Sequence, residues 1–238
     1  IKCGYFIWPP YFDKDLKTGE LSGAVKDYSD RILNLLGFKV EYVETIIGQY
    51  VQDLMSHKID AMCFDGPIIP TTMKQQSFTS PIFYIPVYAY TRKDEHRFNS
   101  IPDLNKPDVT FTAIDGDLSQ HLATYRFPNA KLQSYPGIVD SSQMLVNITT
   151  KKADIFLTDS LTAKNFTTTN PGQIKSLFPE SPLAHYGITF SVSKDEPKLL
   201  ELLNGGITAA HNMGLIEPIL AKDDPDGTSL VRVAPSYQ

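Results

Sequence analysis

The sequence lacks any long hydrophobic run and any cluster of basic residues. Of its 238 residues, 42% are hydrophobic and 21% are charged, yet no stretch approaches the roughly 20 consecutive apolar residues that cross a bilayer. The net charge is −5, so the positive field that binding to a phosphate backbone requires is missing. We therefore expect a globular chain that does not bind nucleic acid.

Motifs of metal and enzyme sites are also missing. Two cysteines and five histidines show no close ligand spacing of the zinc type. There is no Gly-x-Ser-x-Gly, no phosphate-binding loop and no Ser-His-Asp order. Cys3 and Cys63 form a disulfide if their strands adjoin, but we favour two buried thiols that pack as small hydrophobes. The expectation is no metal, no cofactor and no catalysis.

What the sequence does contain is an alternation of strand-like and helix-like segments, in a chain longer than one domain of roughly 100 to 150 residues. The alternation predicts parallel sheets. The first lobe is predicted as strand 2–7, helix 23–36, strand 39–43, helix 50–56 and strand 59–64. The second lobe is predicted as strand 109–113, helix 119–127, strand 131–135, helix 141–149 and strand 154–157.

Two crossovers join the predicted lobes. An apolar, aromatic run at 81–90 leads out of the first lobe, while strand 186–192 and helix 197–213 return to it. The fold class is therefore α/β, with two Rossmann-like lobes joined by a two-strand hinge that lets them close on a ligand. We expect the first lobe at 1–88 plus 189–238 and the second at 89–188. A final strand-like run at 229–233 packs on one of the two lobes.

Five segments, in order, carry a family resemblance over almost the whole chain. They are an aromatic-Pro-Pro-aromatic run at 8–12 followed by Gly19 to Gly23, the stretch 53–61, Phe-Thr-Ser-Pro at 78–81, the stretch 151–159, and the return strand from Tyr186 to Asp195. With them the chain resembles the type II periplasmic solute-binding proteins of the amino-acid class, the family 3 solute-binding proteins of ABC transporters. The resemblance implies a monomer that holds a small molecule between its lobes and delivers it to a membrane permease.

The resemblance also implies a site at the loop tips beyond the carboxyl ends of the strands. Trp8 falls where the family has an aromatic that covers the ligand, although it would equally cap the core beneath. Asp159 falls where the family has the carboxylate that receives the ligand's ammonium group, although it also precedes a helix as an N-cap would. The full set of candidate residues is Trp8, Tyr11, Phe64, Asp65, Gly66, Thr72, Asp117, Leu118 and Asp159.

One departure from the family pattern bears on the ligand. A gap-free alignment places Thr72 where amino-acid binders have an arginine that grips the ligand's carboxylate, and Lys74, two residues on, is a poor substitute. Two further positions differ from the family pattern, since Asp65 replaces a small residue and Pro67 replaces a hydroxyl-bearing residue. Asp117, if it is an N-cap, itself occupies the helix N-terminus where the family binds a carboxylate. An acid-lined site predicts an amine, or another cationic or neutral ligand.

Two other functions fit the same fold. A ligand-sensing domain cut from a membrane receptor or kinase would close in the same way but signal through an attached module. A dehydratase acting on ring carboxylic acids would need a site for anions, which the absence of the arginine disfavours. The chain opens directly on the strand-like run 1–7, as a secreted protein does after its signal peptide is removed, or as a trimmed chain does. We expect a periplasmic protein.

Overall fold

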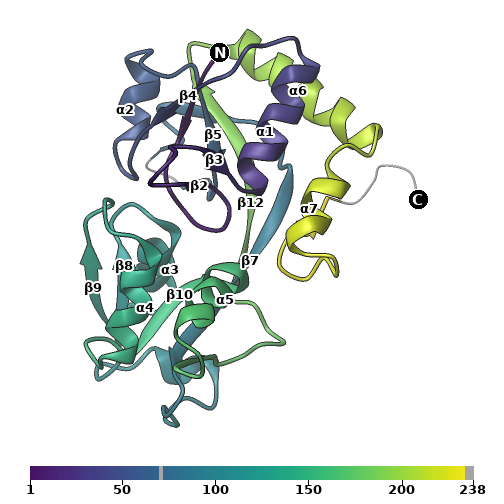
Figure 1. Cartoon of the computed structure of the whole chain (residues 1–238). Helices are drawn as coiled ribbons and strands as arrows, with labels where there is room; N and C mark the ends of the chain where they lie inside the picture. Colours follow the sequence, from purple (N-terminus) through teal and green to yellow (C-terminus); the bar gives the residue numbers. More distant parts are fainter. Residues whose placement is uncertain (70–71, 234–238) are drawn as a thin grey trace. The chain divides into compact units, whose positions relative to one another are not determined.

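The computed structural model describes residues 1–69 and 72–233 (Figure 1). The chain divides into two compact units, lobe 1 with Ile1–Ile85 and Tyr186–Gln238, and lobe 2 with Pro86–His185. We expect the lobes to divide after residues 88 and 188, whereas in the structure they divide after residues 85 and 185. Both pairs of positions lie within the same two strands, β7 (Phe83–Arg92) and β12 (Ala184–Ser193).

Lobe 1 is built on a sheet with the strand order β4 (Glu41–Glu44), β1 (Lys2–Tyr5), β5 (Ala61–Asp65) and β12. Strand β1 runs parallel to both β4 and β5, which confirms the predicted parallel core. Strand β12 runs antiparallel to β5, and β6 (Gln76–Phe78) pairs antiparallel with β12. The sheet is therefore mixed, because its last long strand enters from lobe 2.

Four helices belong to lobe 1, namely α1 (Ala24–Leu35), α2 (Tyr50–Met55), α6 (Pro197–Asn212) and α7 (Glu217–Asp223). Helix α1 buries Val25, Tyr28 and Ile32, whose spacing of three to four residues forms one apolar face. Helices α1 and α6 lie close together, since a Cβ added at Gly206 would lie 2.7 Å from Leu36 Cδ1. Helix α7 and the short hairpin of β2 (Asp13–Lys14) and β3 (Leu21–Ser22) were not among the predicted elements.

A disulfide joins Cys3 of β1 to Cys63 of β5. The two strands are neighbours in the parallel sheet, and the two Cα atoms lie 5.6 Å apart, within the range that a disulfide spans. Our expectation of two buried free thiols is wrong. The reason is that a hydrophobic pattern shows that both cysteines are buried but does not give the register that brings them together.

Lobe 2 has the strand order β7, β10 (Ile155–Asp159), β8 (Thr110–Ile114) and β9 (Lys131–Tyr135). Strand β8 is parallel to β9 and β10, whereas β7 is antiparallel to β10. A further short strand, β11 (Ile174–Ser176), also pairs with β7. The helices are α3 (Leu118–Arg126), α4 (Ser141–Thr149), α5 (Ser160–Thr169) and a 3₁₀ turn at Ile101–Leu104. Lobe 2 thus repeats the β-α-β order of lobe 1, as predicted.

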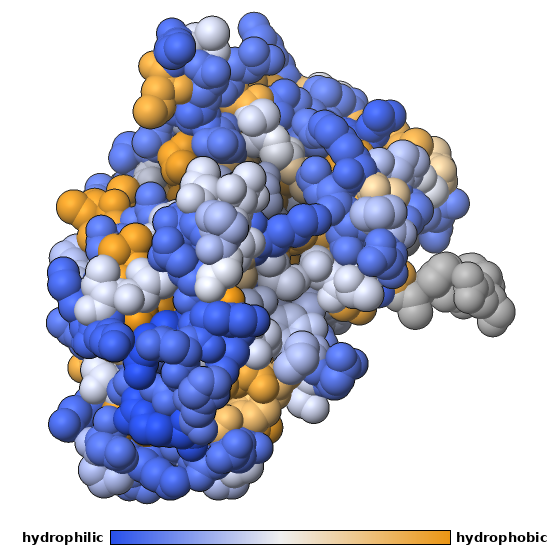
Figure 2. All heavy atoms as spheres, turned by 60° about the horizontal axis from the view of Figure 1, so that its bottom comes forward, coloured by the Kyte–Doolittle hydropathy of each residue, from blue (hydrophilic) through white to orange (hydrophobic). Residues whose placement is uncertain are grey.

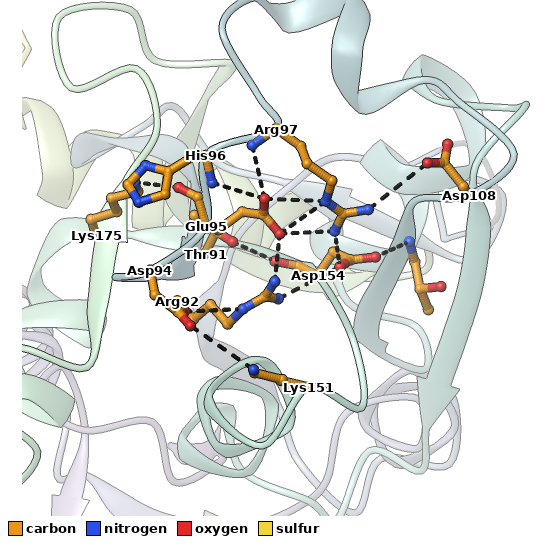
Figure 3. Close-up of polar contacts among 11 residues, drawn as sticks. Thr91, Arg92, Asp94, Glu95, His96, Arg97, Asp108, Lys151, Asp154 and Lys175 are labelled. Atoms are coloured by element: carbon orange, nitrogen blue, oxygen red, sulfur yellow. Dashed lines mark hydrogen bonds and ion pairs between the residues drawn. The ribbon is translucent and has the colours of Figure 1, made fainter.

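An ion-pair network fastens the end of β7 to the start of β10 within lobe 2 (Figure 3). Glu95 is 3% exposed and accepts hydrogen bonds from Arg92 Nη2 at 2.7 Å and Arg97 Nη2 at 2.8 Å. Arg97 also pairs with Asp154, which accepts from the Thr110 amide at 2.9 Å. Burial alone would raise the pKa of Glu95, but the hydrogen bonds from Arg97 and the two guanidinium charges outweigh it and lower the pKa to about 2. The network stabilises the ionised form of Glu95.

The predicted strand at 229–233 is present as β13 (Val231–Arg232), which pairs with Phe83 and Tyr84 of β7 in lobe 1. Asp224 holds the preceding turn, because its carboxylate accepts from the amides of Ser229 at 3.0 Å and Leu230 at 2.7 Å. Arg232 Nη1 donates to the same carboxylate at 3.1 Å. Residues 224–232 are therefore an integral part of lobe 1.

Among the described residues, no helix combines the length and the apolarity that a membrane crossing needs. Hydrophilic side chains cover much of the face drawn in Figure 2, and the hydrophobic ones there lie in separate groups. Single exposed apolar residues such as Leu16, Tyr125 and Ile138 are usual on a protein surface.

Candidate functional site

The candidate residues of lobe 1 gather at one edge of its sheet. Parallel strands β1 and β5 end at the same edge, Phe64 and Asp65 are the last residues of β5, and Trp8 follows β1 after a short link. In α/β sheets, ligands bind beyond the carboxyl ends of the strands. The geometry therefore brings Trp8, Tyr11, Phe64 and Asp65 into one neighbourhood.

A tight turn fixes Trp8. The Trp8 amide donates to the Phe12 carbonyl at 2.9 Å, and the amides of Tyr11 and Phe12 donate back to the Trp8 carbonyl. The turn, which includes the cis peptide bond between Pro9 and Pro10, rests on the start of α1. Gly23 there has a φ of 111°, and a Cβ on it would lie 2.3 Å from the Tyr11 carbonyl oxygen. Only glycine allows this close approach.

Aromatic rings form a continuous group at this edge. The Phe6 ring stacks on Phe64 with centroids 5.0 Å apart and meets the Trp8 ring edge-on at 6.1 Å. The Tyr11 ring lies 6.0 Å from the Phe64 ring. Tyr11 is 1% exposed, Phe64 5% and Trp8 9%, so Tyr11 belongs to the core and Trp8 is the most accessible of the three. Edge-to-face and stacked rings hold one another in defined orientations.

Asp65 is buried, with 3% of its surface exposed, and its carboxylate accepts four hydrogen bonds from lobe 1. Oδ1 accepts from the Gly66 amide at 2.9 Å and the Tyr50 hydroxyl at 3.2 Å, while Oδ2 accepts from Gln76 Nε2 at 2.9 Å and the Ser191 hydroxyl. Burial raises the pKa of Asp65, and the four donors oppose the shift. A carboxylate offers about four acceptor sites, so all of them are in use.

Gly66 and Thr72 lie on the segment that follows Asp65. A Cβ on Gly66 would lie 3.1 Å from Tyr186 Cε2, so a larger residue fits poorly. Both the amide and the hydroxyl of Thr72 donate to the Ile69 carbonyl at 3.1 Å. Thr72 is half-buried and Lys74 is exposed. The position that we predict from the sequence as the counterpart of the family's arginine thus has an uncharged side chain.

The candidate residues of lobe 2 lie at helix N-termini. Asp159 ends β10 and is the N-cap of α5, where its carboxylate accepts from the Thr162 amide at 2.8 Å and the Thr162 hydroxyl at 2.7 Å. Asp117 is the N-cap of α3 and accepts from the Ser119 amide at 3.1 Å and the Ser119 hydroxyl at 2.6 Å. Leu118 is the first residue of α3 and is half-buried. Both aspartates are thus N-caps, one of the two roles considered for each.

Electrostatics differ between the two caps. Burial raises the pKa of Asp117, although the hydrogen bonds from Ser119 act in the opposite direction. Asp159 is 2% exposed, and its charge, after burial itself, raises the pKa of Tyr90. Strands β8 and β10 are parallel neighbours, so the two carboxylates mark the same edge of the lobe 2 sheet. This edge is acidic, although two helix N-termini also point their positive ends there.

Sequence reasoning missed four residues of this neighbourhood, namely Phe6, Tyr50, Gln76 and Ser191. Phe6 lies in the predicted first strand, but nothing in the pattern distinguishes it from a core residue. Ser191 lies between the apolar residues Phe190 and Val192 of β12, and Gln76 is buried at 2% exposure. A polar residue within an apolar run is the one available sign of a buried hydrogen-bond network.

Residues 1–222 match the bacterial extracellular solute-binding proteins, family 3. The chain belongs to this family. The expected fold is confirmed, since two α/β lobes of the type II periplasmic binding protein class are what its structural relatives share.

Individual relatives agree with this assignment. A protein of Campylobacter jejuni named "Probable histidine-binding protein" is 27% identical over 218 residues, which cover 90% of this chain and 80% of the relative. A substrate-binding protein of an amino acid ABC transporter has a TM-score of 0.80 at 20% identity, covering 95% of this chain and 99% of the other. A histidine kinase sensor domain with similarity to periplasmic binding proteins reaches 0.81 at 18% identity, covering 98% and 96%. At these identities the two structures are evidence of the fold alone.

The family establishes the general role, which is capture of a solute outside the cytoplasm. Within residues 1–69 and 72–233, no group of three or more histidine, cysteine, aspartate or glutamate side chains is arranged to hold a metal ion.

Proposed function

We propose that the chain is an amino-acid-type binding protein whose ligand is a small amine, or another cationic or neutral solute, held by side chains from each lobe. The observation that carries this proposal is the pair of N-capping carboxylates, Asp117 and Asp159, at one edge of the lobe 2 sheet. A ligand carboxylate placed there would meet two negative charges, whereas an ammonium group would be attracted. Thr72 supplies no opposing cation.

The aromatic group of lobe 1 supports the same ligand class. The rings of Phe6, Trp8 and Phe64 pack together at the end of the sheet, with Phe6 half-buried and Trp8 9% exposed. A cation over an aromatic face gains about 0.5 to 2 kcal/mol. We propose Trp8 and Phe64 as ligand contacts in lobe 1, with Gly66 and Thr72 lining the site. Tyr11 supports them from beneath, and Leu118 accompanies the two aspartates in lobe 2.

A transport role fits the remaining observations. The Cys3–Cys63 disulfide is typical of a protein in an oxidising compartment such as the periplasm. We propose that the chain acts as a periplasmic monomer that passes its ligand to the permease of an ABC transporter. It performs no chemistry on the ligand and needs no cofactor.

A thermal-shift screen tests the ligand class. The solutes are cadaverine, L-lysine, L-histidine, L-glutamine, L-glutamate and glucose. A ligand at 100 times its Kd stabilises a protein by about 2.7 kcal/mol, so a true ligand raises the Tm measurably. We expect cadaverine to stabilise the chain more than L-glutamate does. Stabilisation by L-glutamate alone would contradict the acid-lined site, and a shift with L-glutamine but not cadaverine would point to a site for an α-carboxylate.

Sensing is the second candidate function, because a histidine kinase sensor domain shares the fold over 98% of this chain. Binding and closure would be the same, and only the attached module would differ. The full gene decides between the two, since a sensor continues into a membrane segment and a signalling domain. A dehydratase activity would appear as turnover of a ring carboxylic acid such as prephenate or arogenate in an NMR time course, which we expect to remain flat.

A further inference from the structure

The Asp65 carboxylate accepts hydrogen bonds from both ends of the segment 66–76, which includes Thr72. The segment starts at Gly66, whose amide donates to Oδ1, and ends at Gln76, whose side-chain amide donates to Oδ2. The Ser191 hydroxyl of β12 and the Tyr50 hydroxyl of α2 complete the set. One buried side chain therefore connects β5, β6, β12 and α2.

The far end of this segment is also held by backbone contacts, because Gln76 of β6 lies opposite Ser193 of β12 and the Lys194 amide donates to the Gln75 carbonyl at 3.3 Å. The segment's internal hydrogen bonds are those of a turn, from the Thr72 and Met73 amides to the Ile69 carbonyl and from the Gln75 and Gln76 amides to the Thr72 carbonyl. The Gln76 side chain is 2% exposed, and its Oε1 atom has no hydrogen-bond partner in the part of the chain that the structure describes. The donation to Asp65 is thus the contact that orients this amide.

We propose that Asp65 is a positioning residue of the ligand site, which fixes Gly66 at the end of β5 relative to Gln76 at the start of β6 and does not touch the ligand. All four acceptor sites of its carboxylate are occupied by groups of lobe 1, so an ammonium group would have to displace one of them. The proposal assigns to Asp65 a role different from the direct contact that the sequence predicts. It rests on the proposed function only for its effect on ligand affinity.

Asp65→Ala and Asp65→Asn separate the two roles. Alanine removes the acceptor of all four donors, and those of Gln76 and Ser191 are buried, where an unsatisfied polar group is costly. Asparagine keeps Oδ1 as an acceptor for the Gly66 amide, and its Nδ2 donates to Gln76 Oε1 once that amide turns over. Oδ1 also remains an acceptor for the Tyr50 hydroxyl, and the Ser191 hydroxyl, which faces Oδ2, can rotate to accept. A positioning role therefore survives in the asparagine variant, whereas a charge contact does not.

The first measurement is hydrogen exchange of the ligand-free protein, followed on peptides that cover residues 66–76. We expect Asp65→Ala to exchange about tenfold faster there than the wild type, and Asp65→Asn to stay within about threefold of the wild type. Asp53→Ala is the matched control, since Asp53 is 5% exposed and accepts from Thr45 and Lys58 but not from the segment. Faster exchange at 66–76 in the control, or none in Asp65→Ala, would overturn the proposal.

The second measurement is the affinity for cadaverine by calorimetry. We expect a loss of about tenfold in Asp65→Ala and less than about threefold in Asp65→Asn. An equal loss in both variants, with exchange at 66–76 unchanged in Asp65→Asn, would show a direct charge contact instead. If Asp65→Ala does not fold, Ser191→Ala removes a single donor and should raise exchange in the same segment. Absence of cadaverine binding in the wild type would refute the proposed ligand class, while the exchange experiment would still decide the role of Asp65.

Discussion

Asp117 and Asp159 occupy equivalent positions in lobe 2, since each is the N-cap of a helix that follows one of two neighbouring parallel strands. Each accepts from the amide and the hydroxyl of a serine or threonine in the first helical turn. Their similarity means that capping and ligand binding must be separated by experiment.

Asp159→Asn separates the two roles. Asparagine caps a helix about as well as aspartate, so the Tm should change little. The loss of a buried charge should weaken binding of cadaverine by at least about tenfold, since a hydrogen bond to a charged group contributes about 1.5 to 3 kcal/mol. Calorimetry measures the affinity. Asp140→Asn is the control, because Asp140 caps α4 in the same way but is exposed. Equal losses in both variants would argue for a general field effect.

Trp8 is the single tryptophan of the chain, so its fluorescence reports on the aromatic group of lobe 1 alone. We expect the emission to shift when cadaverine is added. Trp8→Leu should weaken binding by about 2-fold to 30-fold, the range that corresponds to a cation over an aromatic face, and Trp8→Phe should weaken it less. Tyr11→Phe should leave the affinity unchanged, because Tyr11 is 1% exposed. A Trp8→Leu variant with wild-type affinity would place Trp8 in the core only.

Glu95 makes the stability of lobe 2 depend on pH. Its pKa is lowered from the ordinary 4.5 to about 2, so its contribution is fully present above pH 4.5 and is lost as the pH falls through 2. After allowance for the exposure of Arg97, Glu95→Gln should lower the free energy of unfolding by about 2 kcal/mol at pH 7. Urea unfolding should show this difference shrinking between pH 4 and pH 3.

The control for Glu95 is Asp108→Asn. Asp108 also faces Arg97, at 3.9 Å, but its side chain is 73% exposed, so its ion pair should contribute little. A difference for Glu95→Gln that stays constant with pH would mean that packing of the side chain matters and its charge does not.

The Cys3–Cys63 disulfide closes a loop with a sequence separation of 60 residues. A cross-link over a loop of this length stabilises the folded state by about 4 kcal/mol in the chain-entropy model. We expect the double variant Cys3→Ala/Cys63→Ala to have a markedly lower Tm in calorimetry, and a reducing agent to lower the wild-type Tm in the same direction. A wild-type Tm that is insensitive to a reductant able to cleave the bond would contradict this prediction.

Elements with a strong local pattern could be predicted from the sequence. Strand β9 and helix α4 begin and end at the predicted residues, and α1 differs by one residue at each end. Helix α7 and the two-residue strands β2 and β3 were missed, because segments so short show no periodicity.

The environment of Asp65 could not be predicted, since it depends on contacts far apart in the sequence. Ser191 lies 126 positions from Asp65, and the pairing needs the antiparallel register of β12 on β5. The N-cap roles of Asp117 and Asp159, in contrast, depend on neighbours two or three residues away. Local contacts are readable from one sequence, while long-range register is not.

The pairing of β13 with β7 also bears on aggregation. In lobe 1, Val231 and Arg232 lie opposite Tyr84 and Phe83, so they cover backbone groups that a bare strand edge would present to other chains. Unpaired edges are templates for intermolecular strand addition. The strand lies beyond residue 222, where the match to the family ends. A chain trimmed to the family boundary would retain the candidate binding residues and yet present a sheet edge prone to self-association.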